Sequence, residues 1–295
     1  MRELPADSAR SRSRSIFWNT FHPCAILAAM SVTPTDAAAV TRTATARELL
    51  DLVLGSPAAV AVHDKQAWLG LFSERHVVED PVGGRPVLGG LYDRRSGARG
   101  GAPLDRFWDT FIAPNDIRFH IEHDDIVSGL DVIRDVTIET RLGGGVVAKA
   151  PMHLLYETTL DDGAPRIRRI AAHWEVAPMF AQVAGVDRAK LGVAAAMGTR
   201  MLRLQGLGGS LAFGLAVRSV GERGKRSVRR LVADAQRGDR RATALLGERP
   251  VRDITKIIAA GDTVTATCTV DGAHAVLFCY LNRKTFEVTR TEVYC

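Results

Sequence analysis

One carboxylate, Asp80, stands at a point where the chain changes direction. The surrounding segment, Leu71–Gly90, reads LFSERHVVEDPVGGRPVLGG: a short strand-like run, a proline and then a pair of glycines. Proline ends a strand and glycines allow a turn, so the carboxylate is expected at a strand end. There it can act as a general base inside apolar walls, or it can simply cap the turn before Pro81. Alternation puts Glu79 on the other side of the strand, which argues against a carboxylate pair.

The run VEDPVG at residues 78–83 resembles the ketosteroid-isomerase branch, including SnoaL-like proteins, of the NTF2-like superfamily. Its members carry these six residues after a helix that ends in Leu-Phe, here Leu71 and Phe72, and the similar stretch runs from about residue 47 to 176. The resemblance implies an NTF2-like cone, with helices packed on a curved antiparallel sheet around an apolar cavity. It also implies that Asp80 moves a proton from one carbon to another beside a carbonyl group.

The resemblance implies a partner for Asp80 as well. Aligning VVAKAPMHLLYE (residues 146–157) with the corresponding family strand places His153 where the family has a protonated aspartate. A neutral histidine can donate one hydrogen bond to an oxyanion, although a lone histidine on a strand can equally be a core residue. The family's tyrosine has no counterpart, because its position falls near Ser56. Tyr92 follows in a loop, and Tyr156 is expected to face away from the side of His153.

Two further segments resemble cavity-lining parts of the family. They are FWDTFI in a helix and AAHWEV in the last strand, where His173 is expected to point outward. The residues expected to line or back the cavity are Phe107, Trp108, Phe111, Ala172 and Trp174. Ordinary core packing is the alternative for each aromatic ring, but together they describe an apolar wall suited to a flat hydrophobic ligand.

The order of helical and strand-like patterns predicts an α+β fold. Apolar residues at helical spacing between residues 45 and 72 predict helices, interrupted at Gly55–Pro57. A short helix is expected at Leu104–Ile112, followed by strands with turn signals between them from Ile117 to Val176. Helices that precede antiparallel strands are typical of a domain in which helices cover one face of a sheet.

The C-terminal part of the chain contains a weak repeat of this pattern. Residues 257–272 parallel residues 125–140, and the strand-like runs that follow also correspond. The predicted division is an N-terminal disordered extension (1–44), an NTF2-like domain (45–180), an apolar and basic linker (181–223) and a degenerate second NTF2-like unit (224–295). Because this superfamily commonly dimerises through its sheets, a homodimer or an internal pseudo-dimer is expected.

Positive charge is concentrated in one segment. The 295 residues carry a net charge of +6, whereas Arg200–Arg241 alone has eleven Arg or Lys against three Asp or Glu, a local +8. The region around Asp80 is therefore near neutral, which argues against a nucleic-acid-binding protein. Residues 191–217 are apolar and are interpreted as a linker packed on the protein. The alternative is peripheral membrane contact through residues 191–241, because the longest uncharged run, 14 residues, is shorter than the ~20 that span a bilayer.

Neither a metal ion nor a cofactor is expected. The chain has four cysteines, Cys24, Cys268, Cys279 and Cys295. They form no CxxC pair, and His120 and His123 are expected on opposite faces of a strand, so a shared ion is disfavoured. Free buried thiols suit a reducing, cytoplasmic location, with membrane association as the open alternative.

Two functions of different classes follow from these observations. The first is a ketosteroid isomerase-like enzyme, an intramolecular isomerase that transfers a proton on a hydrophobic carbonyl compound of steroid or polyketide type. Asp80 would be its general base and His153 its electrophilic partner. The second is a non-catalytic carrier of a steroid or lipid, which the missing tyrosine favours. A scaffold built from two NTF2-like units is a third possibility.

Overall fold

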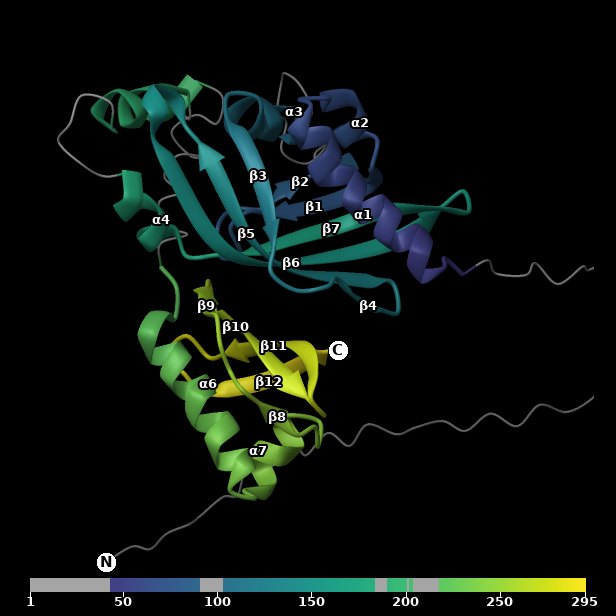
Figure 1. The fold of residues 1–295 in the computed structure, drawn as a ribbon, viewed down its shortest axis with the longest axis vertical. Coiled ribbons are helices and arrows are strands. Elements are labelled where there is room, and N and C mark those ends of the chain that lie inside the picture. The colour runs from purple at the N-terminus through teal and green to yellow at the C-terminus, as the bar shows by residue number, and fades with distance from the viewer. Residues whose placement is uncertain (1–42, 91–102, 184–189, 201, 204–217) are drawn as a thin grey trace, which may run out of the picture. The chain divides into compact units, whose positions relative to one another are not determined.

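The computed structural model describes residues 43–90, 103–183, 190–200, 202–203 and 218–295 (Figure 1). In these ranges the strands form two separate sheets, and helices precede the strands of each. The predicted α+β fold class is confirmed. Nearly all of the proposed N-terminal extension, the loop with Tyr92 and about half of the 181–223 linker lie outside the described residues.

The first unit opens with two helices, α1 (Ala46–Ala61) and α2 (Lys65–Leu69). A reciprocal capping box between Thr45 and Glu48 sets the start of α1. The predicted interruption at Gly55–Pro57 is wrong, because α1 continues through the proline. Its buried face keeps helical spacing from Val53 to Val60, so packing of that face outweighs the backbone hydrogen bond that proline cannot make.

Seven strands make the first sheet. They are β1 (Phe72–Glu79), β2 (Val87–Leu88), β3 (Asp116–Ile121), β4 (Ile126–Ser128), β5 (Asp131–Arg141), β6 (Val147–Asp161) and β7 (Ala164–His173). Their order is β2-β1-β7-β6-β5-β3, with β4 paired to β5, and every pairing is antiparallel except that of β1 with β7. The parallel pair brings the end of β1 beside the end of β7, which places Asp80 near Trp174.

Helices cover one face of this curved sheet (Figure 1). Besides α1 and α2 they are α3 (Pro103–Phe107), the π-helical segment η2 (Trp108–Ile112) and α4 (Val176–Val183). The helix expected at Leu104–Ile112 is therefore present as α3 and η2. Trp68, Phe72 and Ile167 belong to the core that these helices bury against the sheet. This layer is where a cavity between helices and sheet can form.

The second unit is smaller and follows a similar order. Its elements are α6 (Gly221–Gln236), α7 (Arg240–Leu245), β8 (Val251–Arg252), β9 (Ile257–Ala260), β10 (Thr263–Val270), β11 (Ala273–Leu281) and β12 (Val288–Tyr294). The sheet order is β12-β11-β10-β8, with β9 paired to β10. Thus β9 to β12 repeat the sequential pairing of β4 to β7, although descent from a duplicated NTF2-like unit stays a prediction. Within the described ranges, every helix is too short or too polar to cross a bilayer.

Apolar side chains join the two sheets. Ile133, Leu155 and Ala171 of the first sheet share a buried cluster with Val276 and Phe278 of the second. These residues lie on the face of the first sheet that the helices leave uncovered, because they alternate with the residues of the helix-side core. The two sheets therefore pack within one chain, as an internal pseudo-dimer requires. Pairing between two copies of the chain stays a prediction.

A polar cluster lies inside this apolar contact. The two ring nitrogens of His153 lie 2.7 Å from Thr265 Oγ1 and 3.0 Å from Thr267 Oγ1. The carboxylate of Asp135 accepts hydrogen bonds from the Thr267 hydroxyl, at 2.6 Å, and from the ammonium of Lys256. Burial alone would raise the pKa of Asp135, but the ring of His153, 3.6 Å away, and the hydrogen bond from Lys256 hold that pKa far below its ordinary value. Asp135 is therefore an ionised carboxylate that links both units.

Candidate active site

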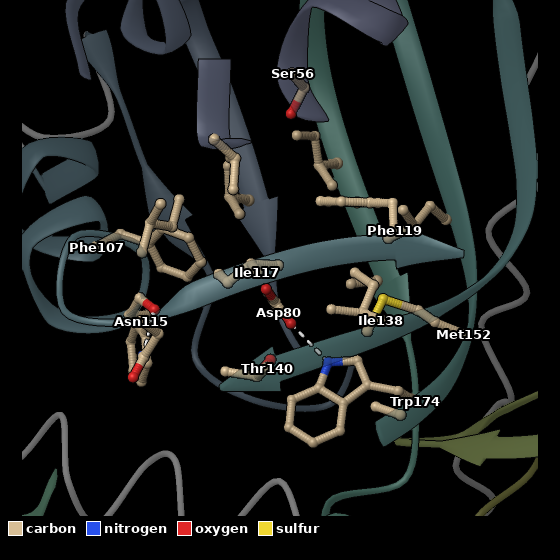
Figure 2. A pocket seen from close by; sticks show the side chains of 18 of the residues that line it. Ser56, Asp80, Phe107, Asn115, Ile117, Phe119, Ile138, Thr140, Met152 and Trp174 are labelled. Atoms are coloured by element: carbon tan, nitrogen blue, oxygen red, sulfur yellow. Dashed lines mark hydrogen bonds between the residues drawn. The ribbon is translucent and has the colours of Figure 1, made fainter. Parts of the chain in front are cut away.

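An apolar cavity of about 160 Å³ lies between the helices and the first sheet (Figure 2). Side chains from α1, α2, α3, η2, α4 and five strands surround it. Apart from two indole N–H groups, the polar lining side chains among the described residues are Ser56, Asp80, Asn115, Thr140 and Tyr156. The cavity thus combines apolar walls with few polar groups, as ligand sites usually do.

Asp80 is the one carboxylate among the described lining residues. It follows the last residue of β1, and its Oδ1 accepts a hydrogen bond of 2.6 Å from Trp174 Nε1–H (Figure 2). The backbone N–H of Val82 donates to the carbonyl of Ala172, which fixes the turn beyond the aspartate to the end of β7. Burial raises the pKa of Asp80, and the hydrogen bond from Trp174 opposes this rise. The site therefore makes Asp80 a stronger base than an exposed aspartate.

Glu79 does not share the site with Asp80. Its carboxylate forms an ion pair with Arg169, with a hydrogen bond of 2.7 Å from Nε. Arg169 also binds Glu157 at 2.6 Å on the same surface. The expectation that these neighbouring carboxylates face opposite sides of β1 agrees with this placement.

A second group of polar residues borders the cavity, and these side chains are buried. Trp68 Nε1–H donates to Ser56 Oγ at 3.0 Å, and Ser56 and Arg134 lie close enough to the Tyr156 hydroxyl to lower its pKa. Arg134 is 1% exposed and its Nε–H donates to Asp125 at 2.9 Å. Burial raises the pKa of Tyr156, so its hydroxyl stays protonated and can donate.

Sequence reasoning did not select Ser56 or Tyr156. Tyr156 was expected to face away from the side of His153, and this relation is correct. The cavity, however, lies on the tyrosine side: Ala150, Met152 and Tyr156 line it. By the resemblance in sequence, the family's tyrosine position falls near Ser56, and in space Ser56 lies beside a tyrosine supplied by β6. The available signal was alternation along β6, which puts the even-numbered residues on one face of the strand. Alternation identifies them as cavity residues only once it is known which face borders the cavity.

The prediction that His153 faces the cavity is wrong. His153 lies on the opposite face of β6, is fully buried between the two sheets, and binds Thr265 and Thr267 of the second unit. Burial lowers its pKa, although Asp135 opposes this effect. The structure therefore does not bring His153 to Asp80, and it gives the histidine a place in the contact between the sheets.

The structure brings most of the predicted aromatic wall to Asp80. Phe107, Phe111, Ala172 and Trp174 line the cavity together with Asp80. The exception is Trp108, which is buried in the core behind the lining residues, with its ring centre 5.5 Å from that of Trp68. His173 points to the other side of the first sheet, as expected, and meets the ring of Phe278 edge-on.

One group of side chains has the spacing of a metal site. His123, Asp135 and His274 bring their ligand atoms within 4.8 Å of one another. The ammonium of Lys256 is bound to the same carboxylate, and its positive charge opposes a divalent cation there. His120 pairs instead with Glu139 at 3.3 Å, so the two histidines of the HIEHDD run do not meet. Cys268 and Cys279 are buried free thiols, as expected.

No protein-family model and no curated protein matches this chain. Solved structures similar to it include a Δ5-3-ketosteroid isomerase from Mycobacterium sp. (26% identity, 45% of this chain and 96% of that chain, TM-score 0.36). Another is a Mycobacterium tuberculosis protein in complex with estradiol-17β-hemisuccinate (20% identity, 44% and 95%, TM-score 0.36). A third is a putative polyketide cyclase from Xanthomonas campestris pv. campestris (17% identity, 47% and 98%, TM-score 0.34).

Proposed function

We propose that this chain binds a hydrophobic carbonyl compound and moves a proton between two of its carbon atoms, with Asp80 as the general base. The observation that carries the proposal is that one carboxylate, the only one among the described lining residues, borders an apolar cavity and accepts a hydrogen bond from an indole N–H. A carboxylate with a raised pKa is better matched to carbon acids than an exposed one. The resemblance in sequence around Asp80 points to the same chemistry.

One residue, Asp80, both removes the proton and returns it. The Asp80 carboxylate takes a proton from the carbon that lies between the carbonyl group and a carbon–carbon double bond of the ligand, which leaves a dienolate. The resulting carboxylic acid returns that proton to the far end of the dienolate, so the double bond moves into conjugation with the carbonyl group, the product is an isomer and Asp80 is again ionised. The Trp174 N–H stabilises the ionised form of Asp80 and positions its carboxylate before the proton is taken.

The enolate oxygen needs a hydrogen-bond donor, and Tyr156 is the best-placed candidate. A guanidinium group can only donate hydrogen bonds, so the neighbouring Arg134 cannot accept the tyrosine proton. The tyrosine proton is then directed to Ser56 or to a ligand in the cavity. A buried, preorganised donor of this kind typically contributes about 10²–10³ in rate. Tyr156 replaces His153 in this role.

The size of the cavity favours a compact ligand. A cavity of about 150 Å³ in another protein holds benzene, so 160 Å³ suits a compound of one or two rings. A four-ring steroid needs displacement of the partly exposed Met179, Phe180 and Met197, which also line the cavity. Methionine side chains adapt readily to such a change.

The second candidate is a carrier that uses the same cavity without turnover. Its support is the composition of the wall, which is apolar apart from a few groups and gives a hydrophobic ligand a dry environment. A hydrophobic small molecule is the partner in both cases. Association with a membrane surface and pairing of two copies stay predictions.

Hydrogen exchange separates the two candidates. The α-hydrogens of 2-tetralone, a two-ring ketone, would be followed by proton NMR in D₂O, and binding of 2-naphthol would be followed by fluorescence. We expect exchange catalysed by the wild-type chain, a loss of about 10²–10⁴-fold in Asp80→Asn, and little change in naphthol affinity. Glu79→Gln is the matched control, because this carboxylate faces Arg169. Full exchange in Asp80→Asn contradicts the base assignment, whereas binding without exchange in the wild type supports the carrier.

A further inference from the structure

At Gly83, the turn that follows Asp80 touches the second unit through backbone atoms. Gly83 lies in this turn with φ +90°, and Gly261 lies in the turn between β9 and β10 with φ +59°. A Cβ placed on Gly83 would lie 2.5 Å from the Cα of Gly261, and one placed on Gly261 would lie 2.8 Å from the Cα of Gly83. Both positions need glycine twice over, for the positive φ and for the close approach.

The residues around this contact are also fixed. Val82 is buried in the apolar cluster that holds Ala260 and Phe278 of the second unit. The carbonyl of Gly261 accepts a hydrogen bond of 2.8 Å from the N–H of Val220, which directly precedes α6. The turn beyond Asp80 therefore packs against the β9–β10 turn, and a backbone hydrogen bond joins the β9–β10 turn to the start of α6.

A separate contact of the second unit lies next to Trp174, the donor of the Asp80–Trp174 hydrogen bond. Lys225 on α6 donates to the carboxylate of Glu175 at 2.8 Å, and Glu175 is the neighbour of Trp174 in sequence. The Lys225 side chain is 10% exposed and that of Glu175 26%, and the Lys225 ammonium also lies 3.2 Å from Glu222. An ion pair this enclosed fixes the backbone that carries the indole more firmly than an exposed pair would.

We infer that the second unit positions the Asp80–Trp174 pair, with Gly261 and Lys225 as the positioning residues. The contact at Gly83 restrains the turn after the carboxylate, and the Lys225 ion pair restrains the segment after the indole. Neither residue lines the cavity. The inference concerns the geometry of the hydrogen bond, while its use in proton transfer rests on the proposed function.

The first test replaces Gly261 in the full chain. Gly261→Ala introduces a Cβ into the contact, whereas Gly247→Ala introduces one at a similar φ, +63°, with no neighbour within 4 Å. The readout is the indole N–H resonance of Trp174 in a ¹⁵N-labelled sample, assigned by its loss in Trp174→Phe. We expect Gly261→Ala to move this resonance upfield and to slow tetralone exchange by about 10- to 100-fold, with naphthol affinity within threefold. Gly247→Ala should match the wild type in all three.

The second test covers the case in which Gly261→Ala does not fold. Lys225→Met removes the charge that binds Glu175, and Lys225→Arg keeps it. We expect the methionine variant to shift the Trp174 resonance and the arginine variant to restore it. An unchanged resonance in both Gly261→Ala and Lys225→Met overturns the inference. If the wild type shows no exchange, only the proposed function fails, because the resonance still reports on positioning.

Discussion

Replacing Trp174 with phenylalanine tests how the site sets the basicity of Asp80. Two opposing effects act on the carboxyl: burial raises its pKa, and the indole N–H at 2.6 Å lowers it. Phenylalanine keeps an aromatic ring against the cavity and removes the donor. The burial effect then stands alone, so the pKa of Asp80 should rise further in Trp174→Phe.

The size of this rise in the pKa of Asp80 follows from the free energy of the lost hydrogen bond. A hydrogen bond to a charged group contributes about 1.5–3 kcal/mol, and one pKa unit corresponds to about 1.4 kcal/mol. Removing the bond should therefore raise the pKa of Asp80 by roughly one to two units. The carboxylate that acts as a base would then form only at a correspondingly higher pH.

The assay is a pH titration followed by the ¹³Cγ resonance of Asp80 in labelled protein. Its assignment comes from Asp80→Asn. The control is Trp108→Phe, which removes the same atoms from a buried indole that does not bond to Asp80. A midpoint in Trp174→Phe that is unchanged or lower than in the wild type would refute the account given for the site.

Three further predictions concern stability and the contact between the sheets. The raised pKa makes the folded chain bind more protons than the unfolded chain above pH 3.8, so the ionisation of Asp80 lowers stability as pH rises. Asp80→Asn should therefore raise the melting temperature at pH 7 and leave it unchanged at pH 3. Lys256→Met leaves the carboxylate of Asp135 buried without the Lys256 ammonium. It should lower the free energy of unfolding, measured in urea, by about 3–5 kcal/mol, and an unchanged free energy would show that the ion pair does not stabilise the fold. His153→Ala should lower the melting temperature but leave naphthol affinity unchanged. A clear loss of affinity would contradict the position of His153 outside the cavity.

The residues that line the cavity as expected are those whose surroundings are local in sequence. Asp80 is placed by the proline and glycines beside it, and Phe107 and Phe111 by a single short helix. The α+β class follows from the order of patterns along the chain. Each of these features depends on neighbours within a few residues, which periodicity and turn chemistry capture well.

The error at His153 has a different origin. Strand β6 is buried on both faces, because helices cover one and the second sheet covers the other, so residues 152–156 are all buried. Alternation separates His153 from Tyr156 but does not say which face borders the cavity. That information lies in two contacts between residues distant in sequence. Tyr156 lies beside Ser56, 100 positions away, and His153 is bonded to Thr265, 112 positions away. No local pattern contains it.

The polar cluster between the sheets also has a consequence for protein engineering. Purely apolar faces can slide past one another at little cost, whereas His153, Asp135 and Lys256 have directional partners in only one alignment. Stacking of the sheets is therefore specified by chemistry as well as by shape. Grafting the C-terminal unit onto another scaffold would require transfer of the matching polar side chains, and cutting the chain before α6 would leave Asp135 without the ammonium of Lys256.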